Sequence, residues 1–227
     1  MENLSLRLST IAESVPQNAL VCDVGTDHGF LPIYLKKTGR ARGVIATDIN
    51  EKPLKKAEEN IKASGVRGIS LRLCDGLSAL SKDECDTVII AGIGGEVISG
   101  ILERGSEIVR KKDVTIILQP TTSPEFLRKC LYDNGFEIKK ETPIEENGKL
   151  YSVMVCVFTG KAQEKPNWFY FSGLVNADSK VGKRYIEKQK NRALKCVKAL
   201  KNIEAKQNEY LYYKEIYEGL WHLTEHF

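Results

Sequence analysis

The sequence predicts an α/β protein in which a mostly parallel sheet is followed by a helical C-terminal segment. Short apolar runs rich in Val and Ile alternate with amphipathic stretches through the first two thirds of the chain. This alternation is typical of parallel strands covered by helices on both faces. Turns containing glycine or acids follow several of those runs, at the edge where such sheets bind ligands. Beyond Asn176 the chain contains no proline and is composed mainly of helix-forming residues.

The predicted elements follow one another in a regular order. A helix is expected over residues 3–14, where Leu4, Leu8 and Ile11 recur at helical spacing and Val15-Pro16 follows. Short apolar runs that end at turn signals predict the strands 19–24, 43–48, 68–73, 87–91 and 114–118. Helices are expected between them at about 30–38, around Val97–Leu102 and at 124–134, and a further helix has Pro53 in its first turn and runs to about Ala63.

The last third of the chain is predicted to hold a β-hairpin and two helices. Strands 136–142 and 149–158 flank the loop Glu145-Glu146-Asn147-Gly148, which indicates antiparallel pairing. Residues 160–166 indicate a linker. Two stripes of apolar residues then predict antiparallel helices with coiled-coil-like packing: Ile186, Ala193, Val197, Leu200 and Ile203, and Tyr213, Ile216 or Tyr217, Leu220 and Leu223. We therefore expect two domains, 1–160 and 161–227.

Composition limits the classes of function. The chain has 227 residues and a formal net charge of +4, and 42% of its residues are hydrophobic. No run approaches the roughly 20 apolar residues of a membrane span, and the N-terminal segment lacks a signal-peptide core. The six cysteines are scattered without a C-x-x-C motif, and only three histidines are present. We therefore expect a cytoplasmic protein with no membrane association and no metal site. Its oligomeric state is not indicated.

Positive charge is concentrated in one segment. Residues 180–206 contain ten Lys and Arg residues and only two acids. Such a segment is a candidate phosphate-binding face, with Lys188, Arg192 and Lys195 as its representative residues. The alternative is an ordinary solvated helix face.

One motif combines acids, glycines and a histidine at the end of the first predicted strand. It is Asp23-Val24-Gly25-Thr26-Asp27-His28-Gly29. Glycines there let the backbone approach a ligand closely, and the following helix offers free N–H groups. Dinucleotide-binding loops have a glycine where this chain has Asp27, whose carboxylate would repel a pyrophosphate. S-adenosylmethionine has no phosphate and carries cationic amino and sulfonium groups. It is therefore the favoured cofactor, with Asp23, Gly25 and Asp27 in its site.

Two further acids follow the next two predicted strands. Asp48 ends the second strand and is placed to accept hydrogen bonds from ribose hydroxyls. Asp75, followed by Gly76, comes after the third strand and could meet the edge of an adenine. Each acid alone could be a helix cap or a turn residue. Three acids at successive strand ends weaken that alternative.

The acceptor side of the site is expected after the fourth and fifth strands. Ala91 and Gly92 are assigned to the cofactor, and Gly94 and Gly95 to a backbone-lined slot for the substrate. Gln119 and Pro120 end the fifth strand on the same rim and are also assigned to the substrate. The alternatives are tight turns that need glycine and a polar helix cap.

Three segments resemble the TrmK family of bacterial tRNA methyltransferases. They are Asp23-Val-Gly-Thr-Asp-His-Gly-Phe-Leu-Pro-Ile33, Ile90-Ala-Gly-Ile-Gly-Gly95 and Leu118-Gln-Pro120. The resemblance covers about residues 4–160. The family usually has Ala-Tyr at Gly29-Phe30, Met at Ile93 and Asn at Thr121. It implies a class I, Rossmann-like S-adenosylmethionine-dependent methyltransferase sheet with a coiled-coil-like C-terminal domain.

The resemblance also implies tRNA as partner and N1 of adenine 22 as the methyl acceptor. Adenine N1 already has an in-plane lone pair, so it needs no base to become nucleophilic. Its methylation places positive charge on the ring and on the N6 amino group, which an acceptor would stabilise. Asp27, beside the expected methyl position, is the candidate acceptor. His28 is expected to orient Asp27 or to contact the base.

Two alternatives to this function are open at this point. A catalytically silent methyltransferase fold could bind RNA through the basic segment, although the complete set of acids favours an enzyme. A methyltransferase for a protein or a small molecule is the other alternative, and the basic segment argues against it.

Overall fold

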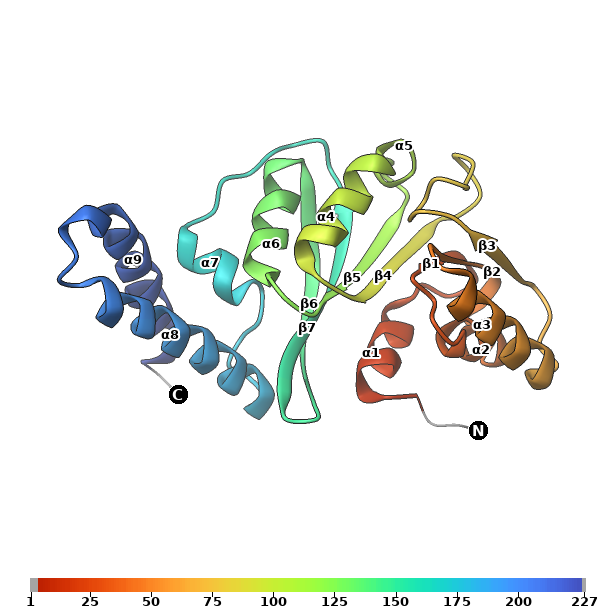
Figure 1. Cartoon of the computed structure of the whole chain (residues 1–227), viewed down its shortest axis with the longest axis horizontal. Coiled ribbons are helices and arrows are strands. Elements are labelled where there is room, and N and C mark those ends of the chain that lie inside the picture. Colours follow the sequence, from red (N-terminus) through yellow and green to blue (C-terminus); the bar gives the residue numbers. More distant parts are fainter. Residues whose placement is uncertain (1–3, 226–227) are drawn as a thin grey trace.

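The computed structural model describes residues 4–225 and contains one seven-stranded sheet with helices on both faces (Figure 1). Its strands are β1 Ala19–Val24, β2 Ala41–Asp48, β3 Ile69–Leu73, β4 Thr87–Ile93, β5 Thr115–Pro120, β6 Phe136–Glu146 and β7 Lys149–Phe158. They lie in the order β3-β2-β1-β4-β5-β7-β6. β1 to β5 pair in parallel, and β7 pairs antiparallel to both β5 and β6. The predicted parallel sheet and its terminal hairpin are both confirmed.

The helices of the described chain divide between the sheet and a C-terminal extension. Those beside the sheet are α1 Leu6–Ser14, α2 Phe30–Lys37, α3 Glu51–Ser64, α4 Gly95–Arg104, α5 Ser106–Val109 and α6 Pro124–Asp133. The extension comprises α7 Asn167–Ser172, α8 Lys180–Leu200, the 3₁₀ turn η1 Glu204–Lys206, and α9 Gln207–Thr224. In Figure 1 the α8–α9 pair forms one end of an elongated molecule, and α2 and α3 lie towards the other end.

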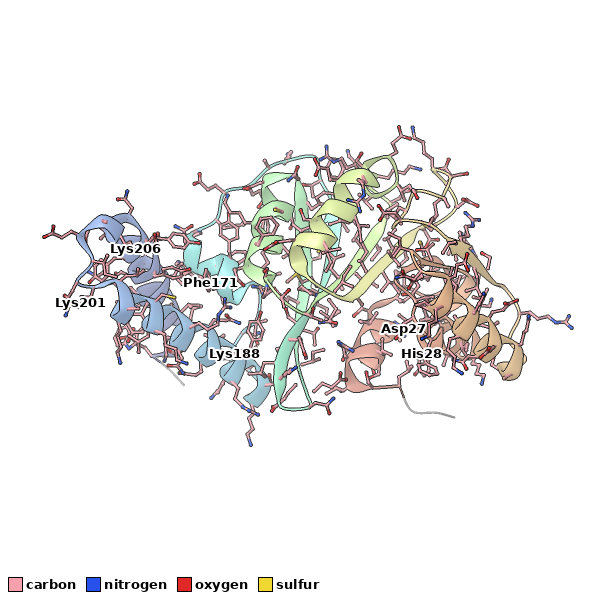
Figure 2. All side chains as sticks on the ribbon, viewed as in Figure 1. Asp27, His28, Phe171, Lys188, Lys201 and Lys206 are labelled. Carbon is pink, nitrogen blue, oxygen red and sulfur yellow. The ribbon has the colours of Figure 1, made fainter. Side chains whose placement is uncertain are left out.

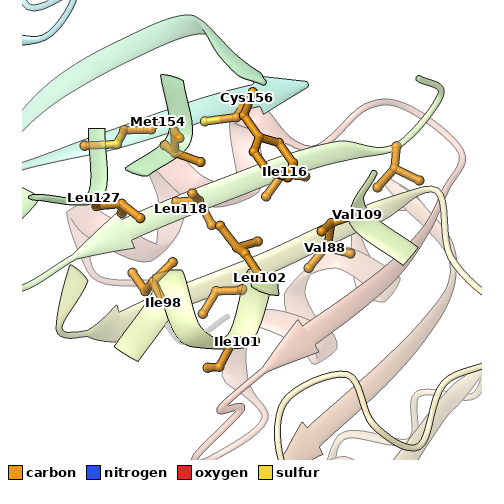
Figure 3. Close-up of a cluster of buried hydrophobic side chains, with 14 of the residues drawn as sticks. Val88, Ile98, Ile101, Leu102, Val109, Ile116, Leu118, Leu127, Met154 and Cys156 are labelled. Carbon is orange, nitrogen blue, oxygen red and sulfur yellow. The ribbon is translucent and has the colours of Figure 1, made fainter. Parts of the chain in front are cut away.

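Alternate residues of the central strands enter two separate cores, which explains why these strands are apolar throughout. Val88 and Ile90 of β4 belong to a cluster that packs against α4 and α6 (Figure 3). Ile89, between them, belongs to the cluster on the opposite face, with Ile11 of α1 and Leu35 of α2. Both faces of the central sheet are therefore buried.

Several boundaries differ from the predicted ones. The first helix begins at Leu6 rather than at residue 3, because the Ser5 hydroxyl caps it by accepting a hydrogen bond from the Leu8 N–H at 3.3 Å. Residue 3 itself lies outside the described residues. β6 extends to Glu146, four residues beyond the predicted end. The short helices α5 and α7 were not predicted, because four and six residues are too few to show a helical period.

The C-terminal helices pack as a pair, but over a shorter length than their apolar stripes predict. Ile186 and Ala193 of α8 pack with Ile216 and Leu220 of α9 in a third buried cluster. Ile203 is 43% exposed, because α8 ends at Leu200 and Ile203 lies in the turn that follows. Leu223 is also exposed near the end of α9. The predicted burial of these two residues is therefore wrong.

A buried ionic cluster joins the sheet to the helical extension. The side chains of Arg128 in α6 and Glu141 in β6 are fully buried, and Arg128 Nη2 donates to Glu141 Oε1 at 2.6 Å. Arg128 also donates to the Tyr170 carbonyl oxygen of α7 at 2.6 Å and to the Tyr185 hydroxyl of α8 at 2.7 Å. Burial acts to lower the pKa of Arg128, but Glu141 and Tyr185 raise it, so the guanidinium stays charged. One side chain therefore links four elements.

Within residues 4–225, none of the helices is both long enough and apolar enough to span a bilayer.

Candidate functional site

A pocket of about 510 Å³ opens at the carboxyl ends of β1, β2 and β4. Ligands bind at this edge of parallel sheets, near the point where the strand order reverses between β1 and β4. The pocket has the size typical of small-molecule and cofactor sites. Among the predicted cofactor residues, all eight line it: Asp23, Gly25, Asp27, Asp48, Asp75, Gly76, Ala91 and Gly92.

Two glycines shape the pocket wall through their backbone conformation. Gly25 follows β1 with φ +77°, and Gly92 near the end of β4 has φ +80°. A Cβ at either position would meet no atom within 4 Å, so the requirement for glycine comes from the left-handed backbone and not from crowding. The Gly25 N–H donates to the Thr47 carbonyl oxygen of β2 at 2.8 Å, which holds the loop against the sheet. The open space beside both glycines leaves room for a ligand.

The three strand-end acids have different environments. Asp23 is only 5% exposed, and burial raises the pKa of its carboxyl to about 6, with a further contribution from the nearby Asp48 carboxylate. Asp48 accepts a hydrogen bond from the Asn50 N–H at 2.8 Å. Asp75 is paired with Arg104 of α4, whose Nη2 lies 3.1 Å from Asp75 Oδ1. A cationic ligand near Asp23 would favour the ionised form of its carboxyl.

Asp27 and His28 form a pair at the open side of the pocket. His28 Nε2 lies 3.5 Å from Asp27 Oδ2, and the Asp27 side chain is 70% exposed. Asp27 has φ +47°, a left-handed conformation that aspartate and asparagine tolerate better than most residues. The His28 ring stacks on Phe30, with ring centroids 5.3 Å apart. Figure 2 shows the two labelled side chains next to each other near α1 and α2. The pair is accessible to a second substrate.

The residues predicted for the acceptor slot do not line the pocket, and three of the four are buried. Gln119 is fully buried, and its Oε1 accepts a hydrogen bond from the Gly92 N–H at 3.2 Å. Gly95 is buried because α4 starts against the 121–123 turn, and a Cβ there would approach the Ser123 carbonyl oxygen to 2.5 Å. Pro120 is also buried, and Gly94 does not line the pocket. As a correction, none of these four residues lines the pocket, and the three buried ones present no surface to a base.

Other residues line the pocket that the sequence did not single out. Arg7 and Leu8 reach it from α1, whereas Val97 and Arg104 reach it from α4. Phe30 completes the wall next to His28. No local motif marks the four positions on α1 and α4, whereas Phe30 lies within the Asp23–Ile33 segment. Their only signal is the tertiary packing of α1 against the β6–β7 hairpin and of α4 against the sheet.

The cations of α8 differ in how they are held. Arg192 donates to Glu125 Oε1 of α6 at 2.8 Å, and its guanidinium lies 5.7 Å from the centroid of the Phe171 ring. It therefore helps to join α8 to the rest of the protein. Lys188 is exposed beside β7, and Lys195 is exposed without an ion pair among the described residues. In Figure 2, Lys188 lies between the pocket residues and the distal pair Lys201 and Lys206.

The donor set fits S-adenosylmethionine. Four aspartates line a pocket that a cationic, phosphate-free molecule would enter favourably. A buried acid, a carboxylate at the end of β2 and a carboxylate after β3 match the amino, ribose and adenine parts of such a molecule in order along the sheet edge. Among residues 4–225, no cluster of His, Cys, Asp and Glu has the arrangement of a metal site.

Comparisons with known proteins agree with this chemistry. Residues 4–154 match a family model described as a methyltransferase domain. The tRNA (adenine(22)-N(1))-methyltransferase of Bacillus subtilis is 39% identical over 154 residues. That match covers 67% of this chain and 64% of the relative, a little under two thirds of the relative's length.

Two solved structures resemble the whole fold. The B. subtilis m1A22 tRNA methyltransferase TrmK superposes with a TM-score of 0.88 at 28% identity, covering 99% of this chain and 100% of that one. TrmK of M. capricolum, solved with the cofactor product S-adenosyl-homocysteine, superposes with a TM-score of 0.79 at 26% identity, covering 97% and 99%. The predicted Rossmann-like methyltransferase fold and the resemblance are thereby confirmed. The chain belongs to the TrmK family of S-adenosylmethionine-dependent methyltransferases.

Proposed function

We propose that this protein transfers a methyl group from S-adenosylmethionine to N1 of adenine 22 in tRNA. The observation that carries the proposal is the pocket, which is lined by four aspartates and has open space beside Gly25 and Gly92. The chain also matches the fold of an m1A22 tRNA methyltransferase along nearly its whole length. S-adenosylmethionine would supply an electrophilic methyl group. The protein has to hold the cofactor, align adenine N1 with that methyl group, and stabilise the charge that develops on the base.

Each strand-end acid has a distinct proposed role towards the cofactor. Asp23, at the base of the pocket, would face the cationic methionine portion. Asp48 would accept hydrogen bonds from the two ribose hydroxyls. Asp75 would accept from the adenine amino group, and its contact with Arg104 at 3.1 Å fixes the position of the carboxylate. Gly25, Gly76, Ala91 and Gly92 would form the surrounding backbone wall.

Removing the Asp48 carboxylate should weaken cofactor binding. Loss of a charged acceptor costs about 1.5–3 kcal/mol, so Asp48→Ala should raise the Kd for S-adenosylmethionine roughly 10- to 100-fold. Isothermal titration calorimetry measures this directly. Asp113→Ala, an exposed acid in the loop before β5, serves as the matched control and should bind like the parent. An unchanged Kd for Asp48→Ala would remove Asp48 from the ribose site.

The tRNA would approach over the exposed face of α8. Lys180, Arg184, Lys188, Lys195 and Lys198 are separated by three, four and seven residues, which places them on one side of the helix. Arg184 forms an ion pair with Glu145, near the end of β6. Burial and the neighbouring Arg192 lower the pKa of Lys188. This face would bind phosphates and place the tRNA across the pocket.

Neutralising this face should reduce tRNA affinity and its dependence on salt. The triple variant Lys188→Gln, Lys195→Gln, Lys198→Gln avoids Arg192, whose pairing with Glu125 is structural. If each lysine contacts one phosphate, the slope of log affinity against log salt should become shallower by about 2–3. Cofactor affinity should not change.

The control for that experiment keeps the change in net charge constant. Lys37, Lys112 and Lys161 are exposed lysines outside α8, and together they can be replaced by Gln. An equal loss of tRNA affinity in both triple variants would show a general charge effect and would contradict a binding face on α8.

Two assays separate the proposed function from its alternatives. Calorimetric binding of S-adenosylmethionine distinguishes an enzyme from a silent RNA-binding module. Transfer of labelled methyl groups into bulk tRNA, compared with transfer into total protein, distinguishes a tRNA enzyme from a protein methyltransferase. We expect cofactor binding, together with labelling of tRNA alone.

A further inference from the structure

The N-terminal helix α1 forms one wall of the pocket. Arg7 and Leu8 of α1 line the cavity together with Asp27 and His28. α1 in turn packs against the β6–β7 hairpin, and Figure 1 shows it between that hairpin and α2. The N-terminal helix is therefore part of the site and not merely a cover for the sheet.

The position of Arg7 is fixed by the tip of that hairpin. Glu146 Oε1 accepts a hydrogen bond from the Arg7 backbone N–H at 3.1 Å, in the first turn of α1. The second oxygen, Glu146 Oε2, lies 3.6 Å from Arg7 Nε. The guanidinium carbon lies 5.9 Å from the centroid of the Tyr151 ring. A carboxylate and an aromatic ring thus hold the side chain on two sides.

The outer end of Arg7 remains available. Its side chain is 27% exposed, and among residues 4–225 neither terminal guanidinium nitrogen makes a hydrogen bond. The other arginine in the pocket lining, Arg104, already donates to Asp75 at 3.1 Å. Arg7 is therefore the arginine of the lining that can still offer its planar pair of terminal donors to an anion.

The charge of the pocket explains why a cation is needed there. Four aspartates suit a cationic cofactor, but they repel the phosphates of an approaching RNA strand. A base in a folded RNA must also be turned out of its stack before its N1 can reach the methyl group. The nucleotide's flanking phosphates then come close to the pocket mouth. An arginine at that mouth offsets the repulsion and holds the strand in the turned-out conformation.

We infer that Arg7, held by Glu146 and Tyr151, binds the backbone phosphate next to the target adenosine when the base enters the pocket. The inference rests on the proposed tRNA methyltransferase function and adds a positioning residue to it. Arg7 acts on the RNA backbone, whereas the reacting atoms are left to Asp27 and His28. Sequence specificity does not come from this contact.

The test couples a variant of the protein to a variant of the RNA. Arg7→Gln removes the charge, Arg7→Lys keeps it, and Arg67→Gln, an exposed arginine before β3, is the matched control. Each protein is tested on tRNA with ordinary phosphates and on tRNA with one neutral methylphosphonate on either side of adenosine 22. Affinity is measured without turnover, and the methyl-transfer rate is measured in a single turnover on saturating tRNA.

A direct contact predicts a specific pattern. Arg7→Gln should lower tRNA affinity or the single-turnover rate about 10- to 100-fold, the range for a lost charge-assisted hydrogen bond. One neutral linkage should cause a similar loss in the parent and in Arg67→Gln, but little further loss in Arg7→Gln. Arg7→Lys should retain most of the sensitivity to that linkage.

Other results have distinct meanings. If Arg7→Gln stays within threefold of the parent, or loses as much as the parent from the neutral linkage, Arg7 does not bind this phosphate. If the parent binds tRNA but forms no methylated adenosine, the proposed function fails, and the affinity measurements still decide whether Arg7 contacts the strand. Circular dichroism and thermal melting confirm that each variant is folded.

Discussion

Replacing Asp27 with asparagine is expected to lower the single-turnover rate of methyl transfer by about 10²–10⁴-fold, the range for loss of a general base or of a charge stabiliser. Methylation at N1 gives the adenine ring positive charge, which is shared with the N6 amino group. A carboxylate beside N6 stabilises this charge and can later accept the N6 proton. The structure leaves the Asp27 side chain 70% exposed at the open side of the pocket, where a base would arrive.

Asparagine is the informative replacement at this position. Asp27 has φ +47°, and asparagine tolerates that backbone conformation, so the loop before α2 should keep its shape. Cofactor affinity should therefore change much less than the rate. His28→Asn tests the neighbouring ring, which we expect to have a smaller effect because it acts by orienting Asp27. A rate for Asp27→Asn within a few-fold of the parent would exclude the carboxylate as the acceptor and leave His28 or the Gly92 backbone.

The second large effect concerns stability. Glu141→Gln should reduce the free energy of unfolding by about 3–5 kcal/mol, because it leaves Arg128 buried without a counter-charge. Glu141 also accepts hydrogen bonds from the Ser152 hydroxyl at 2.6 Å and from the Leu174 N–H at 3.0 Å, so its loss affects both the sheet and the segment after α7. Urea denaturation followed by circular dichroism measures the change.

Two further variants test whether the loss of stability comes from the buried Arg128–Glu141 pair. Asp133→Asn breaks the exposed pair Lys129–Asp133 at the end of α6 and should change stability by less than about 0.5 kcal/mol. The double variant Arg128→Met, Glu141→Leu should be less destabilised than the sum of its two single variants, because no charge is left buried alone. If the losses in free energy of unfolding of the two single variants simply add up in the double variant, Arg128 and Glu141 do not stabilise each other.

Most of the sheet could be predicted from the sequence because its signals are local. The Val- and Ile-rich runs of β4 and β5 are buried on both faces, so they read as continuous apolar stretches. Asn147-Gly148 marked the hairpin, and both residues have positive φ there. The contact between α6 and the helical extension could not be predicted, since Arg128 and Tyr185 are 57 residues apart and no sequence period connects them.

The gathering of the strand-end acids in one pocket could be predicted for a similar reason. Asp23, Asp48 and Asp75 follow successive strands, and topology alone brings strand ends together. The burial of the residues assigned to the substrate could not be predicted in this way. Gln119 looked like a polar rim residue, but it is buried and supports the Gly92 turn. Arg7, in contrast, resembles any surface arginine of an amphipathic helix, and only the folded hairpin places Glu146 beside it.

The central claim is that this protein methylates N1 of adenine 22 in tRNA, and mass spectrometry of the product tests it most directly. Unmodified tRNA is incubated with the purified protein and S-adenosylmethionine, digested to nucleosides and to oligonucleotides, and analysed. We expect one new 1-methyladenosine, located at position 22, and none in tRNA whose adenosine 22 is replaced by guanosine. A methyl group on another base or position, or tRNA that remains unmodified while the cofactor binds, would contradict the claim.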